Sequence, residues 1–518
     1  MPSSTSLLQA DACYLALKAR DARFDGRFFT GVTSTGIYCR PVCRVKTPRP
    51  ENCRFFGLAA QAEGAGFRPC LRCRPELAPN ALAPGQAAYG QVWSIHDASR
   101  ILAQQAARLM DEPDPWLDPA NQAAPAMAQL AARLGVSDRH LRRLFEAQWG
   151  VSPLQYLQTR RLLTAKQLLS DTRLPVAHIA HTSGYASVRR FNAAFVQHYR
   201  LNPTQLRRAG AAQPGHGADP GIVVRLGYRP PYDAPAMLGF FGTRQIHAME
   251  WVDPTPGTLR MARTLRLESA GAVHTGWLAV EFDEPRCQLV LRVSESLGAL
   301  LPLVIRQVRG WLDLDAEPVA INAVLHARFP GGDGLRVPGC MDGFELAVRA
   351  VLGQQITVAA ARTLAQRLMT RFGTVVETPF AQLTRCFPTP AALAQAEGDA
   401  LGQLGIVRQR QAAIVAIARA VSQQGLALHS GVDVPATMAA LKALPGIGDW
   451  TAHYIAMRAL RWPDAFPAGD VALHKALAVQ GEKSPHRAAE AASQAWKPWR
   501  SYAVIRAWSA MNPVKEAT

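Results

Sequence analysis

A chain of 518 residues predicts about three or four domains, each large enough to bury a core of its own. Its hydrophobic content of 48% and charged content of 19% are ordinary for a globular protein, whereas its net charge of +18 favours a polyanionic partner. The sequence shows neither a secretory signal nor an apolar run of about 18 residues, so we expect a cytoplasmic protein that has no membrane partner.

The positive charge is concentrated in the first part of the chain. Residues 1–210 contain 27 Lys and Arg against 14 Asp and Glu, whereas the remainder contains 30 against 25. The first part therefore provides most of the nonspecific attraction to phosphates. Stretches rich in Ala, Pro and Gly at 76–90, 209–221 and 328–334 resemble linkers. They predict four domains: residues 1–78, 91–208, 219–327 and 335–518.

The expected fold class is multidomain and mainly α. The first segment is expected to be a small α+β domain, and the second shows apolar spacings of three and four residues, which predict an all-α domain. The third mixes strand-like stretches such as "CQLVLRV" with the helical stretch "ALLPLVIRQVRGWL", so we expect an α+β domain. Helical periodicity returns in the fourth segment and predicts an all-α domain.

The first segment contains two closely spaced cysteine pairs: Cys39 with Cys43, and Cys70 with Cys73. Two such pairs separated by a loop are typical of a tetrahedral zinc site with four thiolate ligands. The alternative is two buried or disulfide-bonded pairs, which a reducing compartment disfavours. Cys13 and Cys53 lack this spacing, so we expect them to be packing residues.

Basic residues surround these cysteines: Arg40, Arg44, Lys46, Arg49, Arg54, Arg68, Arg72 and Arg74. They predict a phosphate-facing surface around the metal. A thiolate bound to zinc is deprotonated at neutral pH and can still act as a nucleophile when an electrophile is held close. Metal binding and reactivity are therefore compatible at this site.

The contexts "GIYCRPVC" and "GFRPCLRC" belong to a longer resemblance. Over most of its first 75 residues the chain resembles the metal-binding domain of the Ada adaptive-response family. The resemblance implies one Zn²⁺ held by four cysteines, with Cys43, Cys70 and Cys73 as structural ligands. It also implies that Cys39 accepts a methyl group irreversibly from methylphosphotriesters in DNA. Methylation would reduce the negative charge of the centre and so raise the affinity for DNA.

The second segment contains two helix-turn-helix patterns. In "LGVSDRHLRRLF" the second helix carries Arg139, Arg142 and Arg143, and in "GYASVRRFNAAF" it carries Arg189 and Arg190. Taken singly, each pattern could also be an ordinary helical bundle with solvated arginines. The pair resembles the AraC-type DNA-binding domain. This resemblance implies double-stranded promoter DNA as a partner, with RNA polymerase as a further one.

The fourth segment contains a Pro-Gly-x-Gly turn in "LPGIGDWTAHYIAMRAL". Such a turn lets backbone amides approach a phosphate, which makes Gly446, Gly448 and Thr451 candidate DNA contacts, although it could also be a plain joint between helices. In "FPAGDVALHKAL", Asp470 precedes a helical stretch. This residue could be a helix N-cap or a catalytic carboxylate.

Residues 219–518 resemble the AlkA type of 3-methyladenine DNA glycosylase, a member of the helix-hairpin-helix superfamily. Further stretches that carry the resemblance are "VPGCMDGFELAVRAVLGQQIT" and "PWRSYAVIRAW". The resemblance implies that Asp470 is the catalytic carboxylate. It also implies a base cleft lined by four aromatic residues: Trp450, Tyr454, Trp508 and Phe240. Aromatic rings suit a positively charged alkylated base, and a carboxylate stabilises the developing oxocarbenium ion.

Three positions qualify this resemblance. Trp450 stands where strand-cutting relatives carry a lysine nucleophile, so a monofunctional glycosylase is expected. Gln355 stands where the best-known AlkA-type enzyme inserts an apolar wedge into DNA, and Val471 stands where that enzyme has a tyrosine. The cysteines of this half are too few for iron–sulfur ligation, so no such cluster is expected: Cys287, Cys340 and Cys386.

Together these patterns predict a fused alkylation-response protein. It would sense methylphosphotriesters, activate transcription and release bases of the 3-methyladenine and 7-methylguanine type. Two alternatives stay open: a transcription regulator whose glycosylase-like half is inactive, and a zinc sensor or store. The Pro-Cys-His-Arg motif of O6-alkylguanine methyltransferases does not occur in the sequence, so direct reversal of that lesion is not expected.

Overall fold

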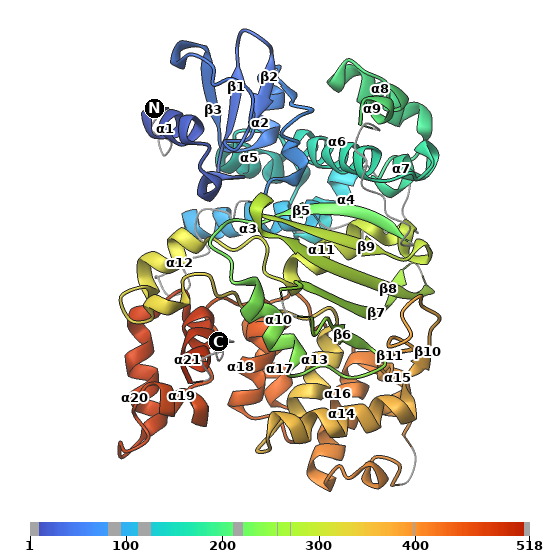
Figure 1. Ribbon diagram of the computed structural model, residues 1–518, viewed down its shortest axis with the longest axis vertical. Helices are drawn as coiled ribbons and strands as arrows, with labels where there is room; N and C mark the ends of the chain where they lie inside the picture. Colours follow the sequence, from blue (N-terminus) through green and yellow to red (C-terminus); the bar gives the residue numbers. More distant parts are fainter. Residues whose placement is uncertain are drawn as a thin grey trace.

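The computed structural model describes residues 10–80, 95–111, 126–210, 221–255, 257–269, 271–396 and 399–511. We call residues 10–80 the metal domain, 95–210 the helix-turn-helix domain, 221–327 the sheet domain and 335–511 the helical domain (Figure 1). The predicted linkers at 76–90 and 209–221 lie mostly outside the described residues. None of the helices in the described ranges combines the length and apolar character needed to cross a membrane.

The metal domain is a small α+β unit, as expected. A four-stranded sheet in the order β3-β1-β2-β4 packs against α2 (Ala59–Gly64), and α1 (Ala10–Ala19) contacts β3. The strands are β1 (Phe29–Val32), β2 (Ile37–Cys39), β3 (Cys53–Phe56) and β4 (Arg68–Pro69). The aromatic side chains of Phe29, Tyr38 and Phe67 form a small core under the sheet. This core is modest, which suits a domain that a metal also stabilises.

The helix-turn-helix domain is all-α over its described residues, 95–111 and 126–210. Its helices are α3 (Ile95–Asp111), α4 (Ala126–Arg133), α5 (Asp138–Trp149), α6 (Pro153–Asp171), α7 (Val176–Thr182), α8 (Val188–Tyr199) and α9 (Pro203–Gly210). The long helix α6 lies between the two units α4–α5 and α7–α8. Ser137 and Ser187 cap α5 and α8 by accepting the third backbone N–H of each helix, both at 3.3 Å.

The sheet domain is built on one antiparallel sheet in the order β5-β9-β8-β7-β6. Its strands are β5 (Ile222–Gly227), β6 (Glu250–Val252), β7 (Arg260–Ser269), β8 (Ala272–Asp283) and β9 (Gln288–Val293), and its helices are α10 (Ala234–Gly242), α11 (Leu301–Trp311) and α12 (Pro318–Leu325). One continuous apolar cluster joins this sheet and α11 to helices α6, α7 and α8. The two neighbouring domains therefore share a core.

The helical domain surrounds the buried helix α13 (Gly343–Leu352). The other helices are α14 (Val358–Phe372), α15 (Pro390–Ala394), α16 (Arg408–Gln423), α17 (Val434–Lys442), α18 (Asp449–Arg458), α19 (Val471–Ala476), α20 (Pro485–Ser493) and α21 (Arg500–Met511). Two very short strands, β10 (Thr374–Val375) and β11 (Arg385–Cys386), are its sole departure, among the described residues, from the expected all-α fold. Leu346, Val348 and Val351 of α13 lie fully or almost fully inside the core.

A buried arginine joins the metal domain to the sheet domain. The Arg229 side chain is fully buried and donates to the carbonyl oxygens of Asp25 and Asn80, both at 2.9 Å, and of Asp315 at 3.0 Å. Beside it, Arg27 of the metal domain forms an ion pair of 2.5 Å with Glu317. A buried guanidinium is tolerated only when its donors are satisfied, so these contacts define a specific interface and not a loose contact.

Candidate metal centre and base cleft

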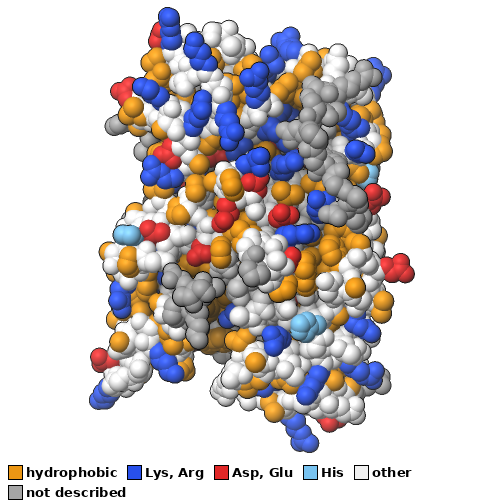
Figure 2. Space-filling model, in the orientation of Figure 1, with side chains coloured by type: hydrophobic (Ala, Val, Ile, Leu, Met, Phe, Trp, Pro, Cys, Tyr) orange, Lys and Arg blue, Asp and Glu red, His pale blue; other side chains and the backbone are white. Residues whose placement is uncertain are grey.

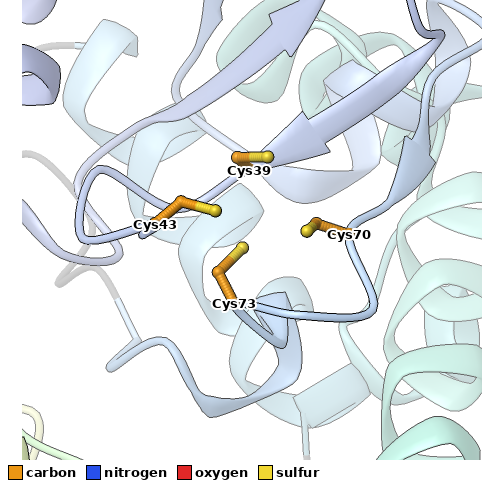
Figure 3. Close-up of side chains that lie close together, drawn as sticks. All are labelled: Cys39, Cys43, Cys70 and Cys73. Atoms are coloured by element: carbon orange, nitrogen blue, oxygen red, sulfur yellow. The ribbon is translucent and has the colours of Figure 1, made fainter. Parts of the chain in front are cut away.

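Strand pairing brings the two cysteine pairs together. Strands β2 and β4 run parallel, with Tyr38 opposite Pro69. Cys39 and Cys70 are the next residues on the two strands and therefore lie side by side. The ligand atoms of Cys39, Cys43, Cys70 and Cys73 all lie within 4.8 Å of one another. Figure 3 shows the four sulfur atoms turned toward a common centre.

The donor set fits one Zn²⁺ ion. Four thiols that converge from two short loops match the ligand number and ligand type of a structural zinc site. All nine cysteines of the chain are free thiols in the structure, so the disulfide alternative is not what the fold shows. In the described part of the chain, no other group of three or more potential metal ligands comes together. Cys13 is buried against Ala16 and Phe28, as expected for a packing residue.

The basic residues around the metal centre divide into two sets. Five of those predicted to face phosphate are exposed: Arg44, Lys46, Arg49, Arg54 and Arg72. Arg68 is half-buried, whereas Arg40 and Arg74 have other roles, which corrects the expectation for these two residues. The Arg40 side chain points inward, with Nε 2.8 Å from Asp25 Oδ1. Arg74 pairs with Asp171 of α6 at 2.6 Å.

Arg40 connects the metal centre to the interface with the sheet domain. Its backbone N–H donates to Cys73 Sγ at 3.4 Å, and its guanidinium donates to the Cys73 carbonyl oxygen at 3.0 Å. The same guanidinium pairs with Asp25, whose carbonyl oxygen accepts from Arg229. The residue that follows Cys39 is therefore part of the scaffold that holds the thiols.

The five arginines predicted for the recognition helices are all exposed. Arg139, Arg142 and Arg143 lie on α5, and Arg189 and Arg190 lie on α8. Figure 2 shows Lys and Arg side chains gathered over the upper part of this face, where Figure 1 places the metal and helix-turn-helix domains. Because an exposed arginine is available to a phosphate or a base edge, both helices present the residue type that DNA binding needs.

The predicted base cleft centres on Asp470, around which three of the four predicted aromatic residues gather. Helix α18 places Trp450 and Tyr454 one turn apart, with stacked rings whose centroids are 5.2 Å apart. Trp508 of α21 lies next to Tyr454, at 6.3 Å between centroids. The indole N–H groups of Trp450 and Trp508 donate to the two oxygens of Asp470, at 2.7 and 3.1 Å.

Asp470 also caps helix α19. Its Oδ1 accepts the backbone N–H of Leu473 at 2.7 Å, and its side chain is almost completely buried. Both interpretations that the sequence allowed are therefore compatible, because the cap fixes the carboxylate while the indoles orient it toward the aromatic residues. The neighbouring Val471 is 67% exposed.

Phe240 belongs to the same cluster through two arginines. The guanidinium groups of Arg244 and Arg458 lie over its ring, 3.9 and 4.8 Å from the centroid. Arg458 also donates to the Tyr454 hydroxyl at 2.5 Å. Burial alone would raise the pKa of Tyr454, but the charges of Arg458 and Arg244 outweigh it and lower the pKa below its ordinary value.

Sequence reasoning missed these two arginines. Each lies four residues after an aromatic residue that was predicted to line the cleft, Arg244 after Phe240 and Arg458 after Tyr454. Tyr454 and Arg458 both lie on α18, where this spacing brings side chains onto one face, whereas Arg244 lies in the turn just after α10; the four-residue spacing was the available signal.

The residues predicted to contact the DNA backbone occupy two neighbouring turns. Gly446 has a positive φ of 76° in the turn before α18, and Gly448 is the N-cap of that helix without a side-chain cap. Gln355 is exposed in the turn between α13 and α14. The Thr451 side chain is only 2% exposed, and its hydroxyl accepts a hydrogen bond from Gln354. The residue as a whole is therefore buried at the start of α18, and Gly446 and Gly448 are the predicted contacts that the turn leaves for a phosphate.

Four family models match the chain in the same order as the four predicted segments. They are the metal binding domain of Ada at residues 12–76, a helix-turn-helix domain at 130–209, the AlkA N-terminal domain at 223–342, and the HhH-GPD superfamily of base excision DNA repair proteins at 348–501.

Curated relatives cover the chain in whole or in part. A probable bifunctional transcriptional activator/DNA repair enzyme AlkA from Mycobacterium tuberculosis is 36% identical over 98% of this chain and 97% of its own length. DNA-3-methyladenine glycosylase 2 of Escherichia coli is 34% identical over 55% of this chain and 96% of its own length. The bifunctional transcriptional activator/DNA repair enzyme Ada of the same organism is 32% identical over 32% of this chain and 39% of its own length.

Proposed function

The chain belongs to the family of bifunctional transcriptional activators and DNA repair enzymes of the AlkA type, and from this we propose that it both excises alkylated bases from DNA and senses DNA methylation. The observation that carries the proposal is that one chain contains two separate clusters of side chains that suit these two reactions. One is the four-thiol cluster around Cys39, and the other is Asp470 between Trp450 and Trp508.

In the base cleft, the proposed reaction is hydrolysis of the N-glycosidic bond of bases of the 3-methyladenine and 7-methylguanine type. A base alkylated at N3 or N7 carries positive charge, and the rings of Trp450, Tyr454 and Trp508 attract it by stacking and cation–π interaction. Phe240, whose ring already lies under the Arg244 and Arg458 guanidinium groups, would form part of the wall. As the bond breaks, the Asp470 carboxylate stabilises the oxocarbenium ion on the sugar. Trp450 offers no amine for a covalent intermediate, so the reaction would end at base release without strand cleavage.

At the metal centre, the proposed reaction moves a methyl group from a phosphotriester oxygen in DNA to the sulfur of Cys39. The C–O bond breaks, a C–S bond forms, and the phosphodiester leaves with its negative charge. Zinc, when bound, keeps the thiols deprotonated and so supplies the nucleophile. The exposed basic residues, such as Arg44 and Arg72, would hold the DNA backbone near this centre.

The helix-turn-helix domain would convert methyl uptake into transcription. Its two recognition helices, α5 and α8, present exposed arginines that can enter successive major grooves of promoter DNA. A transcriptional activator of this kind acts in the cytoplasm and needs a further contact with RNA polymerase, which we include in the proposal. The alternative, a regulator with an inactive glycosylase-like half, is disfavoured by the intact arrangement around Asp470.

One paired experiment tests both centres. The zinc-loaded protein is incubated with DNA treated with a methylating agent; released bases are quantified by chromatography, and the intact protein mass is recorded. We expect release of 3-methyladenine and 7-methylguanine together with one added methyl group on Cys39. Methyl uptake without base release would support the regulator alternative, and an unmodified Cys39 would support a zinc sensor or store.

A further inference from the structure

Gln354, the residue before Gln355, connects the turn between α13 and α14 to the hairpin turn before α18. The Gln354 side-chain Nε2 donates to the Gly446 carbonyl oxygen and to the Thr451 hydroxyl, both at 2.9 Å. These are the two turns in which sequence reasoning placed the DNA contacts of the helical domain. One amide group therefore links them across more than 90 residues of chain.

A second contact restrains the same turn. The Arg410 side chain, in the first turn of α16, donates to the Gln354 carbonyl oxygen. The next residue, Gln355, has a positive φ of 55° and an exposed side chain. A residue with a side chain enters this backbone region only when its surroundings hold it there. The contacts of Gln354 provide that restraint, so the backbone from which the exposed Gln355 side chain projects is held in one position relative to the hairpin.

On the basis of the proposed glycosylase function, we propose that Gln354 is a positioning residue for base extrusion. It sets the distance between the hairpin turn, which holds the DNA backbone, and Gln355, which fills the space that the flipped base leaves. Extrusion costs a few kcal/mol in a paired duplex, and a misplacement of about 1 Å can cost about 100-fold in rate. A tip held in place before DNA binds avoids that loss.

The buried position of Thr451 follows from this role. Its hydroxyl faces Gln354 and not the solvent, so it acts as an acceptor inside the protein while its amide stays at the start of α18. Replacing the amide of Gln354 by a carboxylate would turn an acceptor toward the Gly446 carbonyl oxygen, which is repulsive. The two turns would then separate while each keeps its own local fold.

The test compares Gln354→Met and Gln354→Glu with a matched control, Gln411→Met. All three variants are made in the whole 518-residue chain and loaded with zinc. Gln411 is half-buried, like Gln354, and its Nε2 donates to the Ile406 carbonyl oxygen at 2.7 Å, but this bond does not join the two turns. The first readout is the fluorescence of 2-aminopurine beside a tetrahydrofuran abasic analogue, which reports unstacking. The second is single-turnover release of 7-methylguanine from a paired lesion and from a lesion opposite a missing base.

For Gln354→Met we expect base release about 10-fold slower from the paired lesion and less than about 3-fold slower where extrusion is already easy. The 2-aminopurine signal should fall, while affinity for undamaged duplex changes less than about 2-fold. Equal slowing on both lesions, or behaviour identical to Gln411→Met, would overturn the inference. If the protein without any substitution released no base from either lesion, the proposed glycosylase function would fail. The fluorescence comparison would then still decide the role of Gln354.

Discussion

The metal centre and the base cleft are built in opposite ways. The four thiols of the metal centre come from residues 39–73 and are brought together by a single pair of parallel strands. The base cleft draws on α10, α18, α19 and α21, between residues 240 and 508. Cysteine spacing therefore reveals the first site, whereas the second exists only once the helical domain has packed against the sheet domain.

The two sites also treat charge differently. Near the metal centre, the charged side chain of Arg40 is buried and paired with Asp25. In the cleft, by contrast, the three N–H groups that bond Asp470 come from two indoles and one backbone amide, all uncharged. These donors orient the carboxylate without neutralising it. Its negative charge is thus left for a cationic base and for the sugar cation that forms as the base leaves.

The sharpest test of the separation is Cys39→Ala. We expect methyl uptake to disappear completely, since the acceptor atom is gone, while base release stays within about 3-fold. Intact mass and base release on one methylated DNA sample measure both effects. Cys53→Ala is the matched control, because Cys53 is a half-buried thiol outside the cluster and its loss should leave methyl uptake intact. Loss of base release in Cys39→Ala would show that the two sites are not independent.

The reciprocal change is Asp470→Asn. Asparagine keeps an oxygen for the Leu473 N–H, so α19 should stay capped, but the charge that stabilises the transition state is lost. Base release should fall by about 100-fold or more, and methyl uptake at Cys39 should be unchanged. Single-turnover kinetics and circular dichroism would show whether activity falls without a change of fold. Unchanged base release would remove Asp470 from the mechanism.

A third change addresses the contact between the two regions. Arg229→Met leaves the carbonyl oxygens of Asp25, Asn80 and Asp315 without their buried donor, and we expect a loss of about 2–4 kcal/mol in docking stability. Limited proteolysis and thermal unfolding would report early release of the metal domain. Arg23→Met is the control, since Arg23 is largely exposed and pairs only locally with Asp21. If both variants unfold alike, Arg229 does not hold the metal domain against the sheet domain.

The smallest expected effect is a pH dependence at α8. Burial would lower the pKa of His198, but Glu63, whose Oε2 lies 2.7 Å from His198 Nε2, outweighs it and raises the pKa above its ordinary value. The stabilising contact is therefore complete below about pH 6.5 and is lost as the pH rises through the raised pKa. The free energy of local opening of α8, measured by hydrogen exchange, should therefore fall across this range by less than about 1 kcal/mol. In His198→Gln this pH dependence should be absent.

Fold and site differ in how far the sequence could predict them. Helical periodicity, cysteine spacing and the strand-like runs gave the four fold types, because each depends on residues close in the chain. The inward direction of Arg40 could not be predicted, since its partners include Asp25 and, through it, Arg229 in another domain. The indole bonds to Asp470 were equally hidden, because they join helices that meet only in the tertiary structure.

The shared core and the buried contacts of Arg229 determine what happens when the chain is cut into two fragments. A cut between residues 210 and 221 would separate α6, α7 and α8 from the sheet that completes their apolar cluster, and it would leave Arg229 on one fragment and its acceptors in the metal domain on the other. Each fragment would expose the apolar and hydrogen-bonding surface that the other fragment covers in the intact chain. Produced together, they should reassemble as a split protein; produced singly, each should be prone to aggregation.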